Sequence, residues 1–235
     1  MAGNRGPRII ALVGTDGSGK TTQAHGLAEW LTAHGRPARY WQNAGGRRWL
    51  GRLARRLGRP DGEALLGRAG MLAVEAVLRW LAIGRAVASS RLTGQVAVMD
   101  RYAVCQYASI RAHAPARIHQ LRSQGRRPGP GGTVGDWARQ ELRRPGERLA
   151  RAAYRVFPPP DVTFLLAVSP AEAYHRIEAR GTDHEQLEFL TAAAAAYERL
   201  PEAATFVRVD ADAPPDEVAA KLRAHLAVPL APLAG

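Results

Sequence analysis

Short apolar runs alternate with longer, helix-compatible segments along this chain. Five runs have strand character, at 9–13, 38–42, 95–99, 162–168 and 205–209. The helix-compatible segments are 21–34, 49–57, 62–92, 103–124, 138–156, 170–180, 185–200 and 215–226. Because parallel strands are joined by crossovers over the faces of a sheet, this alternation indicates a parallel sheet covered by helices. The pattern predicts an α/β fold with a five-stranded parallel sheet, in a single domain spanning 1–235.

One segment departs from this pattern. Residues 124–135 read QGRRPGPGGTVG, and proline and glycine dominate them. Such a composition cannot hold a helix and has little apolar surface to bury, so it predicts a flexible loop insertion. By contrast, Ser169-Pro170 supplies a cap and a first-turn proline for the helix that follows the fourth strand.

The composition narrows the class of protein. Apolar residues make up 46% of the chain, which is enough for a buried core, and no stretch approaches the roughly 20 apolar residues of a membrane span. The lone cysteine, Cys105, excludes an internal disulfide and is typical of a reducing, cytoplasmic location. The net charge of +12 favours anionic partners. An arginine-rich, GC-biased coding sequence explains the same excess, so charge alone does not predict nucleic-acid binding.

The strongest motif lies directly after the first apolar run. Residues 14–22 read GTDGSGKTT and complete the pattern G-x-x-x-x-G-K-T between a strand and a helix. Glycines in such a loop turn backbone N–H groups toward a polyphosphate, and the helix N-terminus adds positive potential. Lys20 can reach the β- and γ-phosphates, and the Thr21 hydroxyl can ligate Mg²⁺. The residues predicted to bind ATP are Gly14, Gly17, Ser18, Gly19, Lys20, Thr21 and Thr22.

Two further patterns have the chemistry of phosphate handling. Asp100 directly follows the third apolar run, where a carboxylate can hold Mg²⁺ through water, and Arg101 beside it can bind a second phosphate. A surface Asp–Arg pair is the plain alternative, and the glycine loop argues against it. Arg176 and Arg180 share one helix face and can neutralise charge on a transferred phosphoryl group. A solvated basic helix end explains these two arginines equally well.

Four stretches together resemble the thymidylate kinase family of nucleoside monophosphate kinases. Residues 14–23 resemble its G-x-D-G-x-G-K-T-T-Q loop, and 100–102 resemble its D-R-Y motif. Residues 160–166 resemble its P-D-L-T-x-x-L strand, and 169–181 resemble its P-E-x-x-x-x-R-x-x-x-R-G stretch, where a lid begins. Their order and approximate spacing hold from residue 8 to about 226. The resemblance implies a P-loop NTPase fold with a five-stranded parallel sheet, a lid at 176–188 and a homodimer formed by the central helices.

The resemblance also implies roles for single residues. Asp16 is expected to contact the sugar of the acceptor nucleotide, Arg79 its base, and Arg101 its phosphate, with Tyr102 beside it in the acceptor site. Arg176 and Arg180 are expected to lie over ATP. The predicted catalytic residues are therefore Lys20, Asp100, Arg101, Arg176 and Arg180, with Mg²⁺ as the cofactor held by Thr21 and Asp100.

The departures from the family pattern fall in the acceptor site. Many bacterial members have R-E-P-G-G-T after the second strand, where this chain reads QNAGGR at 42–47. Arg47 or Arg48 is the candidate substitute for the missing arginine. The family's S-x-x-A-Y-Q becomes Cys105 followed by Ala108-Ser109-Ile110. Phosphoryl transfer from ATP is still expected, but specificity for thymine does not follow.

Three functions stay open on the sequence. The first is an ATP-dependent nucleoside monophosphate kinase with dTMP as the default acceptor. The second keeps this chemistry but uses another acceptor, such as an unusual nucleotide, a nucleoside or a specialised metabolite. The third is a nucleic-acid-stimulated ATPase or a GTP switch. The chain has no N-K-x-D guanine motif, which argues against the GTP switch.

Overall fold

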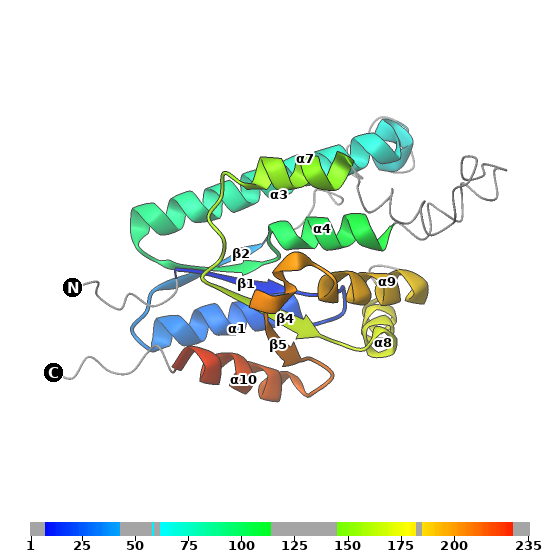
Figure 1. The fold of residues 1–235 in the computed structure, drawn as a ribbon. Coiled ribbons are helices and arrows are strands. Elements are labelled where there is room, and N and C mark those ends of the chain that lie inside the picture. The colour runs from blue at the N-terminus through cyan, green and yellow to red at the C-terminus, as the bar shows by residue number, and fades with distance from the viewer. Residues whose placement is uncertain (1–7, 43–57, 59–61, 114–144, 182–184, 228–235) are drawn as a thin grey trace.

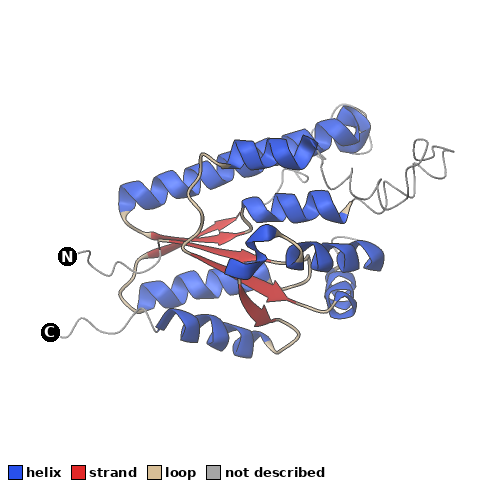
Figure 2. Cartoon of the chain, viewed as in Figure 1, coloured by secondary structure: helices blue, strands red, loops and turns tan. Residues whose placement is uncertain are grey.

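A fully parallel, five-stranded sheet forms the middle layer of the molecule, with helices on both faces (Figure 1, Figure 2). This computed structural model describes residues 8–42, 58, 62–113, 145–181 and 185–227. The strands are β1 (Ile9–Val13), β2 (Ala38–Gln42), β3 (Val96–Asp100), β4 (Val162–Ala167) and β5 (Val207–Asp210), and their order in the sheet is β2-β3-β1-β4-β5. The predicted α/β class and parallel sheet are confirmed.

Side chains of the central strand alternate between two apolar cores. Ile10 and Leu12 pack with one group of helices, whereas Ala11 and Val13 pack with another on the opposite face. The first face is covered mainly by α1 (Lys20–Ala33), α8 (Pro170–Arg180) and α10 (Pro215–Ala227). The second is covered by α3 (Gly62–Thr93), α4 (Ala103–Ala112), α7 (Pro145–Tyr154) and α9 (Leu187–Glu198). All five residues of β1 are buried, as expected for the centre of a sheet covered on both faces.

The strand order places the loop after β1 at a switch point. β1 pairs with β3 on one side and with β4 on the other, so the chain leaves β1 in one direction for β2 and β3 and in the other for β4 and β5. Ligands of open parallel sheets bind beyond the carboxyl ends of the strands at this point. In register, Leu12 of β1 lies opposite Asp100 of β3, so Asp100 ends its strand beside the loop.

Several predicted boundaries are corrected. The fifth strand begins at Val207 instead of 205, because Pro201 starts a 3-10 helix, η1 (Pro201–Thr205). The helix predicted at 103–124 ends at Ala112, and 114–124 lie outside the described residues. The helix predicted at 138–156 is described from Pro145 to Tyr154.

Other predictions cannot be compared with the structure. The helix at 49–57, the loop at 124–135 and Arg47 lie outside the described residues, as do residues 182–184 of the predicted lid. Among the described helices, none is long and apolar enough to cross a membrane.

Candidate active site

The loop after β1 packs closely against β4 and the first turn of α8. Gly14 and Gly17 have φ angles of 146° and 84°. A Cβ atom on Gly17 would lie 2.5 Å from the Ala173 carbonyl oxygen at the start of α8, and one on Gly14 would lie 2.6 Å from the Leu166 carbonyl oxygen of β4. Glycine is therefore required at both positions by conformation and by space. This packing fixes the loop against the sheet directly before α1 begins at Lys20.

Lys20 is folded into the loop that precedes it. Its side chain is 5% exposed, and Nζ donates hydrogen bonds to the Thr15 carbonyl and, at 3.3 Å, to Ser18 Oγ. Asp16 Oδ1 lies 3.7 Å from Nζ. Burial, and next the positive charge of Arg101, hold the pKa of Lys20 below its usual value. An anion bound at the loop would relieve both effects, because it would supply negative charge to a desolvated ammonium group.

Asp100 and Thr21 form a direct pair between β3 and the first turn of α1. Thr21 Oγ1 donates a hydrogen bond of 2.5 Å to Asp100 Oδ2. Asp100 is 5% exposed, and its other carboxylate oxygen, Oδ1, is buried without a hydrogen-bond partner among the described residues. A buried carboxylate oxygen without a donor has a high desolvation cost. A divalent cation with its bound water would satisfy it, so these residues fit the Mg²⁺ predicted from the sequence.

Asp16 of the loop forms an ion pair with Arg101, the residue after β3. Arg101 has a φ angle of 81° and is the one residue other than glycine with positive φ in the described part of the chain. Its backbone N–H donates to the Leu12 carbonyl at 3.0 Å, which holds this conformation. A non-glycine residue in the left-handed region costs about 1–3 kcal/mol, and such residues cluster at functional sites. The backbone thereby aims the guanidinium at the loop.

Burial and neighbouring groups have opposite effects on the pKa of Arg101. Burial lowers this pKa, but the carboxylate of Asp16 and further neighbours outweigh it and raise the pKa overall. Arg101 therefore stays a cation, in a position where an acceptor phosphate could compete with Asp16.

Arg79 and Gln106 form a buried polar pair between α3 and α4. Both residues are 8% exposed, and Arg79 Nη1 donates to Gln106 Oε1. Arg79 Nε is buried without a hydrogen-bond partner among the described residues. A planar ligand with hydrogen-bonding edges would satisfy the donors and acceptors that Arg79 and Gln106 do not use on each other. The predicted position of Arg79 near an acceptor base is consistent with this arrangement, and its role stays a prediction.

Three other predicted site residues make contacts with the protein itself. The Tyr102 hydroxyl donates to the Pro158 carbonyl at 2.6 Å, and burial raises the pKa of this phenol. Arg176 Nε donates to Glu172 Oε1 at 2.7 Å, and Nη1 donates to the Ala211 carbonyl at 2.9 Å. Arg180 Nε donates to the Arg176 carbonyl at 3.2 Å. These contacts place Arg176 beside the turn after β5, and the predicted contacts of all three residues with ligands stay predictions.

Sequence reasoning missed several residues that the structure brings to the site. Gln106 was not singled out, although a polar residue inside the apolar start of α4 was a usable signal. Tyr40 donates to Asp100 Oδ2 at 3.5 Å and had no motif to mark it. Tyr197 of α9 is 4% exposed and interacts with the Cys105 thiol and with Arg101, a meeting of distant segments that only the fold reveals.

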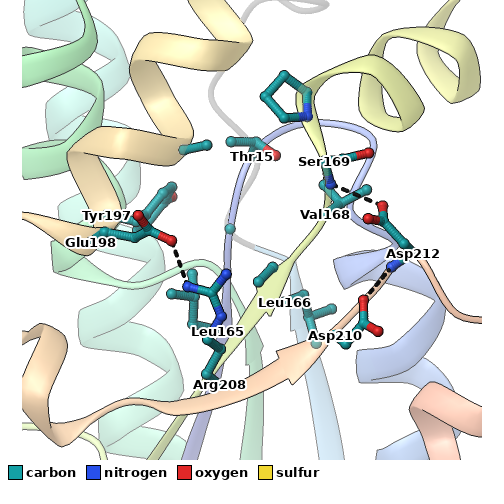
Figure 3. Close-up of a pocket in the computed structure, with 14 residues that line it drawn as sticks. Thr15, Leu165, Leu166, Val168, Ser169, Tyr197, Glu198, Arg208, Asp210 and Asp212 are labelled. Carbon is teal, nitrogen blue, oxygen red and sulfur yellow. Dashed lines mark hydrogen bonds and ion pairs between the residues drawn. The ribbon is translucent and has the colours of Figure 1, made fainter.

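A cavity of about 400 Å³ opens on one side of the loop (Figure 3). Gly14 and Thr15 form part of its wall, and the other walls come from the carboxyl ends of β4 and β5 and from α9. Its lining does not include Lys20, Thr21 or Asp100. The exposed ion pair between Arg208 and Glu198 lies at the left of the lining residues in Figure 3. The cavity therefore borders the start of the loop at Gly14 and Thr15 but does not reach Lys20, Thr21 or Asp100.

Comparison with known proteins points to one family. The family model described as "Thymidylate kinase" matches residues 133–222. A thymidylate kinase of Cutibacterium acnes is 29% identical over 172 residues, covering 73% of this chain and 71% of the relative. A thymidylate kinase of Leifsonia xyli subsp. xyli is 29% identical over 235 aligned positions, covering 95% of this chain and 96% of the relative. The second similarity spans nearly all of both chains, including the loop at 14–22.

Proposed function

We propose that the chain is a divergent member of the thymidylate kinase family and acts as an ATP-dependent nucleoside monophosphate kinase with dTMP as its acceptor. The observation that supports this most directly is the double contact between the loop and the end of β3. Thr21 binds Asp100, and Asp16 binds Arg101, so the residues proposed to bind the donor phosphates lie beside the arginine proposed to bind the acceptor phosphate. Two adjacent phosphate sites are what transfer between nucleotides requires.

The proposed reaction is one in-line transfer. A phosphate oxygen of the acceptor bonds to the γ-phosphorus of ATP while the bond from the γ-phosphorus to the β,γ-bridging oxygen breaks, and ADP takes the electron pair. Backbone N–H groups of the loop and Lys20 bind the β- and γ-phosphates. Arg101 exchanges part of its pairing with Asp16 for the acceptor phosphate, which fixes the attacking oxygen. Arg176 and Arg180 are proposed to neutralise charge on ATP.

Thr21 and Asp100 would hold Mg²⁺ in this site, with Asp100 acting through a bound water. When bound, Mg²⁺ neutralises part of the negative charge that builds up on the phosphates during transfer. The buried, unpartnered Oδ1 of Asp100 supports this assignment.

Acceptor recognition is proposed to involve the buried pair of Arg79 and Gln106. A pyrimidine with a carbonyl and an N–H on adjacent ring positions offers an acceptor and a donor to an arginine–amide pair. The alternative of a different acceptor gains no support from the relatives, whose names specify thymidylate. The cytoplasmic location expected from the sequence stays a prediction.

We further infer that the protein is a homodimer that uses one face of α3. Val77 and Leu81 lie one helical turn apart on α3, and their side chains are 57% and 48% exposed. Exposed apolar residues at this spacing form a stripe suited to a second helix. Sedimentation velocity should give a dimer for the wild type and a monomer for Leu81→Glu. A monomeric wild type at micromolar concentration would remove this part of the proposal.

A panel of nucleoside monophosphates tests the function. With MgATP and a coupled assay for ADP, we expect turnover with dTMP well above that with AMP, GMP or CMP. Turnover with none of the panel, from folded protein that binds ATP, would favour a different acceptor. ATP hydrolysis stimulated by DNA or RNA without a phosphorylated nucleotide product would instead support the ATPase.

A further inference from the structure

An aromatic pair covers one side of the Thr21–Asp100 contact. The Tyr40 hydroxyl donates to Asp100 Oδ2 at 3.5 Å. The Tyr40 ring is stacked on the ring of His25, with 3.6 Å between centroids and 27° between planes. His25 follows Thr21 by four residues on α1, so both project from the same side of the helix. Neither Tyr40 nor His25 belongs to the loop at 14–23 or to the motif at 100–102.

The sheet register explains why Tyr40 reaches Asp100. β2 pairs in parallel with β3, with Tyr40 opposite Val98 and Gln42 opposite Asp100. Tyr40 and Asp100 are therefore offset by two residues and lie on the same face of the sheet. Tyr40 packs against the core beneath α1, which fixes the base of its side chain, and the stacked His25 limits rotation of its ring.

The two hydroxyl donors use the same carboxylate oxygen. Thr21 and Tyr40 both donate to Oδ2, whereas Oδ1 has no hydrogen-bond partner among the described residues. A carboxylate held by two donors on one oxygen cannot rotate to exchange its oxygens without losing both bonds. A phenol keeps its proton at neutral pH, so the Tyr40 hydroxyl remains a hydrogen-bond donor.

We propose that Tyr40 is a positioning residue for Mg²⁺ binding: its hydroxyl holds Asp100 so that Oδ1 is presented to the water shell of the metal. This inference rests on the proposed function, because it assumes that Asp100 serves Mg²⁺. Removing a hydrogen bond to a metal-binding carboxylate typically reduces metal affinity 10- to 100-fold. At 3.5 Å the Tyr40 bond is long, so we expect an effect below this range, of about three- to tenfold.

Titration calorimetry with ADP provides a test that does not depend on activity. The quantity to compare is the ratio of ADP affinities in the presence of saturating Mg²⁺ and in the presence of EDTA. In Tyr40→Phe we expect this ratio to fall about three- to tenfold, with the affinity in EDTA within about twofold of the wild type. In kinetic assays the Mg²⁺ concentration at half-maximal rate should rise by a similar factor, while kcat at saturating Mg²⁺ is recovered.

Tyr154→Phe is the matched control, because it also removes one hydroxyl with a long hydrogen bond, to the Ala76 carbonyl at 3.4 Å on the other face of the sheet. Its ratio of ADP affinities in Mg²⁺ and in EDTA should equal that of the wild type. In an Asp100→Asn background, Tyr40→Phe should change the ratio by less than twofold, since the carboxylate that it acts on is absent.

The outcomes separate this inference from the function on which it rests. An unchanged Mg²⁺ ratio in Tyr40→Phe would overturn the positioning role while leaving the kinase assignment intact. An equal loss of ADP affinity with and without Mg²⁺ would also overturn it, because that pattern indicates a packing role. Failure of the folded wild type to bind ADP under either condition would refute the proposed function itself.

Discussion

Glu147 joins α7 to α4, and its replacement gives a stability change whose size follows from the structure. Its side chain is 6% exposed and accepts hydrogen bonds from Arg111 Nε at 3.0 Å, Arg111 Nη2 at 2.9 Å and Arg151 Nε at 2.9 Å. Arg151 also binds Glu202 of η1 and lies 4.2 Å from the ring centroid of Tyr107. One carboxylate thus ties two helices together and supports the contact with η1.

The loss of unfolding free energy expected for Glu147→Gln lies between the losses for breaking a surface ion pair and a fully buried one. Breaking a buried ion pair costs about 3–5 kcal/mol, and exposed pairs contribute about 0–1 kcal/mol. Here the Arg111 and Arg151 side chains are 17% and 28% exposed, and each keeps another partner. Glutamine preserves the shape and can still accept one bond. We expect a loss of about 2–3 kcal/mol, which lowers Tm by roughly 4–12 °C for a chain of this size.

The stabilisation by Glu147 should decrease as the pH falls. Burial raises the pKa of Glu147, but hydrogen bonds and charge from Arg111 and Arg151 outweigh it and hold the pKa below the ordinary 4.5. As pH falls through 4.5, the unfolded carboxyl takes up a proton before the folded one does. The stabilisation is therefore fully present at pH 7 and is lost progressively below about pH 4.5.

Urea unfolding of wild type and variants at pH 7 and pH 3.5 measures both effects. Glu198→Gln is the matched control, because the Glu198–Arg208 pair has side chains 54% and 62% exposed and should change stability by about 0.5 kcal/mol at most. The difference between wild type and Glu147→Gln should shrink at pH 3.5. A loss in Glu147→Gln no larger than in Glu198→Gln, or a difference of equal size at both pH values, would refute this reasoning.

Three further predictions concern the candidate site. Lys20→Met should lower kcat by roughly 100-fold or more, the size expected when a preorganised charge is removed. Circular dichroism should show an unchanged fold. Activity within tenfold of wild type would contradict this prediction. Gly17→Ala should disrupt the loop, because its Cβ would meet the Ala173 carbonyl oxygen at 2.5 Å, and we expect ATP affinity measured by calorimetry to fall at least tenfold. Gln106→Leu removes the hydrogen-bond partner of Arg79 Nη1, so KM for the acceptor should rise about 10-fold or more. KM for ATP should change less than twofold. Equal changes in both KM values would count against an acceptor-site role.

Much of the fold was predictable because the strands have a strong apolar pattern. β1, β2 and the start of β4 were placed correctly, since apolar runs bounded by glycine, proline or polar residues leave few alternatives. The fifth strand was misplaced by two residues. Propensity favoured extending it back to Thr205, but Pro201 favoured a 3-10 turn, and the tertiary structure adopts that turn.

The site was predictable only where chemistry leaves a local signature in the sequence. The loop at 14–22 and the Asp100–Arg101 pair have such signatures, and the structure brings them together. Tyr40 and Gln106 have none, because their contacts depend on sheet register and on the packing of α3 against α4. Pairing between residues distant in sequence is set by the fold, and a single sequence does not reveal it.

The central claim is that the loop and the end of β3 transfer a phosphoryl group between two bound nucleotides. Phosphorus NMR of the folded protein with MgATP and dTMP tests it most directly, because the technique identifies every phosphorus-containing product. We expect ADP and dTDP to form in equal amounts, and both to form at least about 100-fold more slowly with Lys20→Met. Release of inorganic phosphate in place of dTDP, or no reaction from protein that binds both nucleotides, would contradict the account.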